Sequence, residues 1–168
     1  MSELEGTVLG ELAKRGECTA YALRRCFASS PSSHWSGSAG AVYPVVERLA
    51  AERFVAARDA TNGRRAARTF RITPAGRKRL EAWLLQPFAR DLVSLPPDPI
   101  RTRVHFLGAL SAEDRNRFLH AAIEHLRWQR EVLDATVPID EFERHVLRGA
   151  DSVLEAQRRW LLELWTPT

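Results

Sequence analysis

The chain has 168 residues, 45% of them hydrophobic, and a formal net charge of +4. This composition suits one or two small domains with a buried core and excludes a disordered chain. The sequence has no apolar run long enough to cross a bilayer, and it begins without the basic and apolar regions of a signal peptide. We therefore expect a cytoplasmic protein with no membrane partner.

The basic residues concentrate in the first half of the chain. Residues 1–90 contain 15 Lys and Arg against 8 Asp and Glu, whereas residues 91–168 contain 10 against 13. Between residues 53 and 79, Asp59 is the only acid among nine basic residues. This density is typical of a segment that binds a polyanion, and a merely solvated basic face is the alternative.

Two helices are expected at the start of the chain. The first has an apolar stripe and ends near Gly16; the stripe comprises Leu4, Val8, Leu9 and Leu12. The second begins at Thr19, a helix-capping residue, and continues through Phe27. Cys18 and Cys26 would both lie in this second helix, about 12 Å apart along its axis, which exceeds the reach of a disulfide. We expect both to be inert thiols.

The segment 35–49 has the pattern of a DNA-reading helix. Ser36 or Ser38 can cap it, and a buried stripe follows at spacings of three and four residues: Val42, Val45, Val46 and Leu49. The opposite face begins with small residues that allow close approach to another surface, and then offers a hydroxyl and a guanidinium to phosphates or base edges. This face carries Gly40, Ala41, Tyr43, Pro44, Glu47 and Arg48. Pro44 lacks a backbone donor, so the helix must begin shortly before it or bend there.

An arginine-rich hairpin is expected next. Residues 54–59 and 67–72 read as short strands, and Asn62-Gly63 is typical of a tight turn between them. Thr73 and Pro74 then mark the start of a fourth helix that continues through Leu84. Three helices, a hairpin and a further helix form the order of a winged helix-turn-helix module.

The same region resembles the PadR family of transcriptional regulators. The matching motifs, which cover roughly residues 3 to 85, are Leu4-Glu5, Tyr21-Ala-Leu23, Trp35-Ser-Gly-Ser38-Ala-Gly40-Ala-Val-Tyr43-Pro44 and Phe70-Arg-Ile72-Thr73-Pro-Ala-Gly76. The resemblance implies a DNA-binding domain at residues 1–90, whose recognition segment enters the major groove. Together with the exposed face described above, it assigns contacts with double-stranded DNA to Ser38, Gly40, Ala41, Tyr43, Pro44, Arg48, Arg64, Arg65 and Arg68.

The rest of the chain reads as helical. Residues 91–97 are expected to form a linker, because prolines lie within this segment and just after it. The pattern of residues 98–168 predicts one short helix and two long amphipathic helices. The last helix, from Asp140, carries the stripe Phe142, Val146, Val153, Leu161 and Leu164. Helices this long cannot bury both apolar faces against a small winged domain, so we expect a homodimer; a monomer folded back on itself is the alternative. The resemblance likewise implies dimerisation through these helices.

No catalytic constellation is present, so we expect neither an enzyme nor a cofactor or metal. His120 and His125 are five residues apart and point about 140° apart around a helix, which does not suit a zinc site. Five tryptophans remain, and the resemblance implies that some family members sense planar small molecules. Trp128 and Trp160 are therefore candidate contacts for an aromatic effector, with ordinary packing as the alternative.

The fold class expected is mainly α with a small β-hairpin wing. The function expected is a ligand- or stress-responsive dimeric repressor that binds a palindromic operator. A dimeric protein-interaction module of the same fold, without specific DNA binding, is the alternative.

Overall fold

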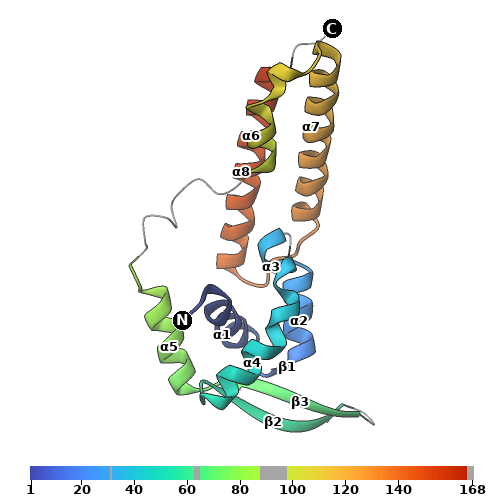
Figure 1. Ribbon diagram of the computed structural model, residues 1–168. Helices are drawn as coiled ribbons and strands as arrows, with labels where there is room; N and C mark the ends of the chain where they lie inside the picture. Colours follow the sequence, from blue (N-terminus) through green and yellow to red (C-terminus); the bar gives the residue numbers. More distant parts are fainter. Residues whose placement is uncertain (31, 63–64, 88–97, 166–168) are drawn as a thin grey trace. The chain divides into compact units, whose positions relative to one another are not determined.

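The chain divides into two units, Met1–Val93 and Ser94–Thr168. The computed structural model describes residues 1–30, 32–62, 65–87 and 98–165 (Figure 1). Within these described residues, the first unit carries helices α1 to α5 and a three-stranded antiparallel sheet, and the second carries α6, α7 and α8. The prediction of a mainly helical chain with a small β-hairpin is confirmed, while the expected linker at 91–97 lies outside the described residues.

Helix α1 spans Glu3–Arg15 and is fixed at both ends by local interactions. The Oγ of Ser2 accepts a hydrogen bond from the Glu5 N–H at 3.2 Å, and Glu5 Oε2 accepts one from the Ser2 N–H at 2.8 Å. This reciprocal pair satisfies two donors that a helix N-terminus leaves open. Gly16 ends the helix with a φ of 79°, a conformation that costs glycine little. The predicted end of the helix is confirmed.

Strand β1 (Cys18–Thr19) and helix α2 (Ala20–Ala28) follow. Thr19 caps α2 as predicted, because its Oγ1 accepts from the Ala22 N–H at 3.1 Å. The placement of both cysteines in one helix was wrong: Cys18 lies in β1, opposite Phe70 in the sheet. Strand β1 was missed because two residues carry no periodicity, and only the edge of β3 makes them a strand. Burial raises the pKa of both thiols, which keeps them protonated.

Three short helical segments form the recognition region: α3 (Ser33–Gly37), the 3-10 turn η1 (Ala39–Ala41) and α4 (Val42–Ala51). The prediction of one helix capped by Ser36 or Ser38 was wrong. No side chain caps α4, and the Ser38 hydroxyl instead donates to the carbonyl of His34 at 2.8 Å. Pro44 lies in the first turn of α4, where its missing N–H removes no helical hydrogen bond. The helix thus begins shortly before Pro44, as predicted.

The hairpin consists of β2 (Val55–Asn62) and β3 (Arg65–Ile72), paired in register from Val55 opposite Ile72 to Asn62 opposite Arg65. The sheet order is β1-β3-β2. The two strands are longer than the sequence suggested, and residues 63–64 of the predicted turn lie outside the described residues. The hairpin extends from the helices as a wing (Figure 1).

Helix α5 (Pro74–Leu84) begins as predicted, with Pro74 in its first turn and Thr73 as cap. The Thr73 hydroxyl accepts from the Gly76 N–H at 3.0 Å and lies 3.0 Å from the Phe54 carbonyl oxygen. A Cβ at Gly76 would overlap that same carbonyl oxygen. Gly76 therefore allows α5 to pack directly on the chain that leads into β2.

One buried cluster unites α1, α2, α4 and the sheet. It includes the whole predicted stripe of α4, and its larger members are Val8, Leu9, Leu12, Leu23, Phe27, Val42, Val45, Val46, Leu49, Val55, Phe70 and Ile72. Burying these side chains contributes the main stabilisation of the unit. It also decides which face of α4 remains in solvent.

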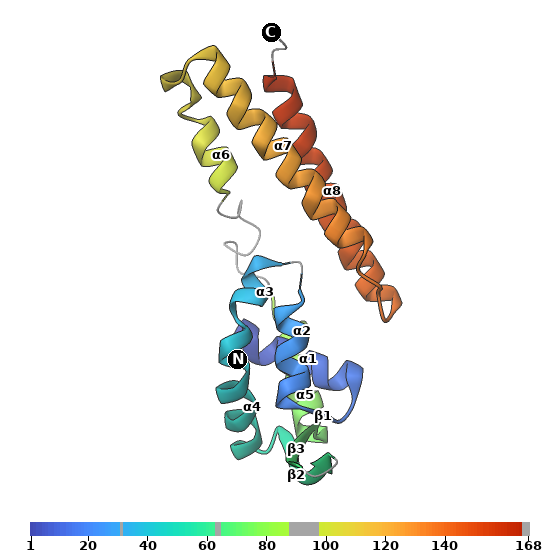
Figure 2. The same ribbon diagram turned by 90° about the vertical axis from the view of Figure 1, so that its right-hand side faces the viewer.

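The second unit contains α6 (Pro99–Val104), the 3-10 turn η3 (Leu107–Ala109), α7 (Ala112–Asp134) and α8 (Glu141–Leu164). Helices α7 and α8 pack side by side (Figure 2). Ser111 caps α7 and Asp140 caps α8, through hydrogen bonds of 3.1 and 2.7 Å. The buried residues of α7 are Leu119, Ala122, Ile123, Leu126 and Leu133. Among the described residues, no helix combines the length and apolarity needed to cross a membrane.

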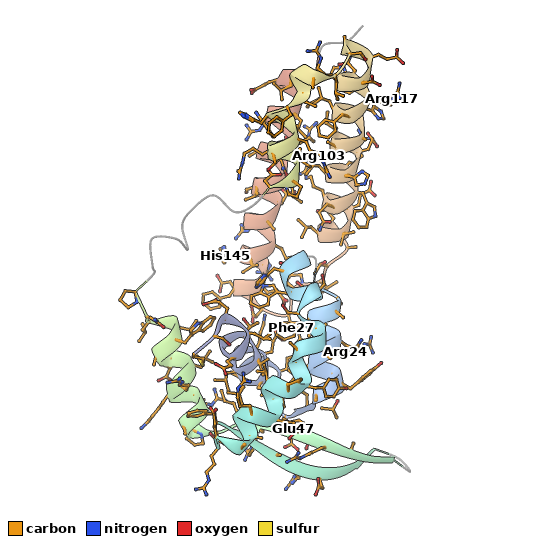
Figure 3. All side chains as sticks on the ribbon, viewed as in Figure 1. Arg24, Phe27, Glu47, Arg103, Arg117 and His145 are labelled. Atoms are coloured by element: carbon orange, nitrogen blue, oxygen red, sulfur yellow. The ribbon has the colours of Figure 1, made fainter. Side chains whose placement is uncertain are left out.

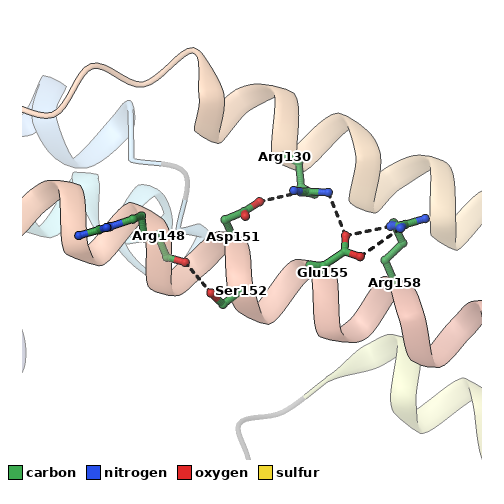
Figure 4. Close-up of polar contacts among 6 residues, drawn as sticks. All are labelled: Arg130, Arg148, Asp151, Ser152, Glu155 and Arg158. Atoms are coloured by element: carbon green, nitrogen blue, oxygen red, sulfur yellow. Dashed lines mark hydrogen bonds and ion pairs between the residues drawn. The ribbon is translucent and has the colours of Figure 1, made fainter.

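An ion-pair network fixes α7 against α8 (Figure 4). Arg130 of α7 donates to Asp151 at 2.6 Å and to Glu155 at 2.9 Å, and Arg158 donates to Glu155 at 3.0 Å. The hydrogen bond from Arg158 lowers the pKa of the Glu155 carboxyl. Solvent-exposed ion pairs contribute little to the free energy of unfolding. Their directed geometry instead selects the register of the two helices.

The apolar stripe predicted for α8 splits into two faces. At about 100° per residue, Phe142, Val146 and Val153 share one face, and Leu161 lies about a quarter turn away. Leu161 is fully buried against α7, while the other three are 79%, 68% and 67% exposed. Including Leu161 in the outward stripe was therefore wrong, because α7 already covers it. An uncovered apolar strip remains on α8.

Candidate nucleic-acid interface

The exposed face of α4 is set by its buried stripe. At about 100° per residue, Pro44 and Glu47 lie opposite the stripe, and Tyr43 and Arg48 flank them. All four are exposed, with Tyr43 at 43%. Figure 3 labels Glu47 on this helix. The structure thus brings the predicted Tyr43, Pro44 and Arg48 to one face, together with Glu47, an acid that the predicted DNA contacts left out.

The turn before α4 presents little side-chain bulk. Gly40 and Ala41 are exposed, and a Cβ at Gly40 would meet nothing within 4 Å. The Ser38 hydroxyl already donates to the His34 carbonyl, so toward a ligand it has only its acceptor lone pairs available. The backbone of η1 can therefore approach another surface closely, as the sequence suggested.

Arg48 is directed toward α1. Its Nε and Nη2 donate to Glu5 Oε1 at 3.1 and 2.7 Å. The same carboxyl accepts a hydrogen bond from the Ser2 N–H. This backbone hydrogen bond is the main cause that lowers the pKa of Glu5 below 4.5, and the hydrogen bond from Arg48 also lowers it. The Glu5 side chain is 18% exposed and that of Arg48 is 49% exposed. Arg48 thus ties the recognition helix to the start of α1, while half of its side chain remains in solvent.

Arg68 connects the wing with α4. Side chains alternate along a strand, so Arg68 lies on the same face of β3 as the buried Phe70 and Ile72. Its guanidinium lies 5.5 Å from the centre of the Phe70 ring, and its Nη1 donates to Glu47 Oε2 at 2.6 Å. Asp59 is the only acid between residues 53 and 79, and folding brings a second acid, Glu47, beside Arg68.

The structure describes only some of the other wing arginines. Arg64 lies outside the described residues. For Arg65 of β3 the structure describes only the backbone, which pairs with Asn62 of β2. Arg58 and Arg71 are exposed on the strands. The exposed face of α4 and the arginine-rich hairpin therefore meet at the Glu47–Arg68 contact and form one continuous surface of the first unit.

Comparison with known proteins agrees with this geometry. Residues 8–82 match the transcriptional regulator PadR-like family. The negative transcriptional regulator PadR of Bacillus subtilis (strain 168) is 25% identical over 117 residues, which are 68% of this chain and 62% of that relative. The match therefore spans less than two thirds of the relative's length. The first unit of the chain is thus similar to the PadR-like family of transcriptional regulators.

Solved PadR structures share the fold over nearly the whole chain. Bacillus subtilis PadR in complex with operator DNA superposes with a TM-score of 0.82 at 20% identity, covering 97% of both chains. The same protein with p-coumaric acid gives 0.72 at 20% identity, covering 96% and 95%. The PadR-like regulator BC1756 from Bacillus cereus gives 0.74 at 18% identity, covering 95% and 91%. Members of the PadR-like family are regulators of transcription and not enzymes.

The candidate effector residues lie on different helices of the second unit. Trp128 of α7 is 60% exposed. Trp160 of α8 is partly buried against the core cluster of the unit and lines an open depression together with Val104, His105 and Phe106. No ring contact joins the two tryptophans among the described residues. His125 directs its Nδ1 to the Ala121 carbonyl at 2.9 Å, and the described residues contain no group of metal-ligating side chains.

Two functional neighbours were not among the site residues predicted from the sequence. The helical spacing placed Glu47 opposite the buried stripe, but the predicted DNA contacts left it out. Glu5 could not have been found, since nothing in the sequence shows that the first turn of α1 lies beside α4.

Proposed function

We propose that the chain is a homodimeric repressor that binds a palindromic operator in double-stranded DNA. Residues 1–90 would bind DNA and residues 98–168 would dimerise. The observation that carries the proposal is the single surface that α4 and the arginine-rich wing form around the contact between Glu47 and Arg68. Helix α4 would enter the major groove, and the wing would contact phosphates or the adjacent minor groove.

The uncovered strip of Phe142, Val146 and Val153 supports the dimer. An apolar strip this exposed is a costly surface for a monomer. A two-fold pair of such chains would present two α4 helices to two half-sites, as a palindrome requires. Repression would follow from occupation of the operator, in the cytoplasm where the DNA lies.

A small aromatic effector would control binding. Bacillus subtilis PadR has been crystallised both with operator DNA and with p-coumaric acid. In the present chain, Trp128 and Trp160 supply planar surfaces in the second unit. An effector bound there would favour one dimer geometry and so change the spacing of the two recognition helices.

The test of DNA binding is the triple variant Arg64→Ala, Arg65→Ala and Arg68→Ala. For every phosphate that the variant no longer binds, the slope of log affinity against log salt should fall by about 0.9. Phosphates carry no sequence information, so the variant should bind every duplex more weakly than the wild type does. Binding to duplex DNA is measured at several salt concentrations by fluorescence anisotropy.

The matched control replaces three exposed arginines of the second unit by alanine: Arg103, Arg115 and Arg144. The net charge changes equally, so the control isolates the wing from the overall charge. A wing variant that retains the wild-type slope and affinity would contradict the proposal and favour a protein-interaction module without specific DNA binding.

A further inference from the structure

Glu47 occupies an unexpected position for an acid. It lies opposite the buried stripe of α4 together with Pro44, so it projects from the proposed DNA-reading face. Its side chain is 51% exposed. A carboxylate so placed would repel the phosphates of DNA unless its charge were compensated and its oxygens met donors.

Arg68 supplies the compensation. Its Nη1 lies 2.6 Å from Glu47 Oε2, and the Phe70 ring beneath the guanidinium restricts where that group can move. The hydrogen bond crosses from the wing to α4, between residues 21 positions apart. The carboxylate is therefore held in one place. The pair of Glu47 and Arg68 has no net charge.

The chemistry of the major groove selects one ligand for such a carboxylate. Guanine offers only acceptors there, N7 and O6, and thymine offers the acceptor O4 and a methyl group. Adenine has a donor at N6 but an acceptor at the adjacent N7, which repels a second carboxylate oxygen. Cytosine alone offers the N4 amino donor without an adjacent acceptor of its own.

We propose that Glu47 determines the sequence specificity of α4 by accepting a hydrogen bond from the N4 amino group of a cytosine in each half-site. Arg68 positions and neutralises the carboxylate while it does so. The inference rests on the DNA-binding function proposed above. The alternative is that the pair only links α4 to the wing and makes no contact with a base.

The experiment selects binding sites from a duplex library with a randomised central region, using the full chain. The wild type is compared with Glu47→Gln and Glu47→Ala. Glu52→Gln is the matched control, since it removes an exposed acid at the end of the same helix. Thermal unfolding shows that each variant is folded, which is expected because half-exposed ion pairs contribute little stability.

The wild type should select a C·G pair at one position of each half-site, and replacing that pair should weaken binding roughly 5- to 100-fold. Glu47→Gln should select A·T at that position, because an amide matches adenine N6 and N7. Glu47→Ala should lose the preference there alone, and Glu52→Gln should select the wild-type site.

Two negative results are distinguishable. If the wild type selects a defined site and both Glu47 variants select the same one, Glu47 only links α4 to the wing, and the inference is wrong while DNA binding stands. If the wild type binds no duplex, or binds without selecting any sequence, the proposed function fails and the inference fails with it.

Discussion

The strip on α8 allows a quantitative prediction about the dimer. Val146 and Val153 are 68% and 67% exposed on the same face as Phe142. Replacing both by alanine removes two methyl groups from each, worth about 0.8 kcal/mol per buried group. With about two thirds of each side chain newly buried in a dimer, each site contributes about 1 kcal/mol.

Symmetry doubles the effect. In a two-fold dimer each substitution occurs twice, so the double variant should lose about 4 kcal/mol of association free energy. This corresponds to about a thousandfold increase in the dimer Kd. The isolated fold should be unchanged, because neither valine belongs to the buried cluster of its own unit.

Sedimentation equilibrium over a range of protein concentrations measures the Kd. Val137→Ala is the control, since Val137 is 83% exposed but lies in the connection between α7 and α8. It should shift the Kd by less than tenfold. A wild type that is monomeric at micromolar concentration, or a double variant with the wild-type Kd, would refute the assignment of the strip to a dimer interface.

Two further predictions concern stability, measured by urea unfolding. Arg48→Ala and Glu5→Gln should each lower the free energy of unfolding by up to about 1 kcal/mol at neutral pH, and the double variant should lose no more than the larger single loss. Folding lowers the pKa of Glu5, so its contribution is present above 4.5 and disappears as the pH falls through the folded-state pKa. Losses that add would contradict the pairing, as would losses that do not shrink as the pH falls and the carboxyl becomes protonated. Gly76→Ala should cost about 3 kcal/mol or more, because the new Cβ overlaps the Phe54 carbonyl. Gly10→Ala in α1, whose nearest neighbour would lie 4.0 Å away, should instead add up to about 1 kcal/mol, and equal effects of the two substitutions would show that the packing at Gly76 is misjudged.

The sequence alone determined what depends on nearby residues. The ends of α1 and α5, the cap of α2 and the buried stripe of α4 follow from spacing, capping residues, Gly16 and Pro74, each acting within a few positions. The hairpin was visible from its alternating strands and turn residues. These features sufficed to predict the winged fold and the side of α4 that faces solvent.

Only the tertiary structure decided which charges meet. Arg48 and Glu5 are 43 positions apart and Arg68 and Glu47 are 21 apart, so neither pair has a signal in the local pattern. The same holds for β1, which exists because β3 lies beside it, and for Leu161, which α7 buries. Local rules specify helices and strands, but the partners of a long side chain depend on how those elements pack, because the core fixes their positions and brings distant residues within hydrogen-bonding distance.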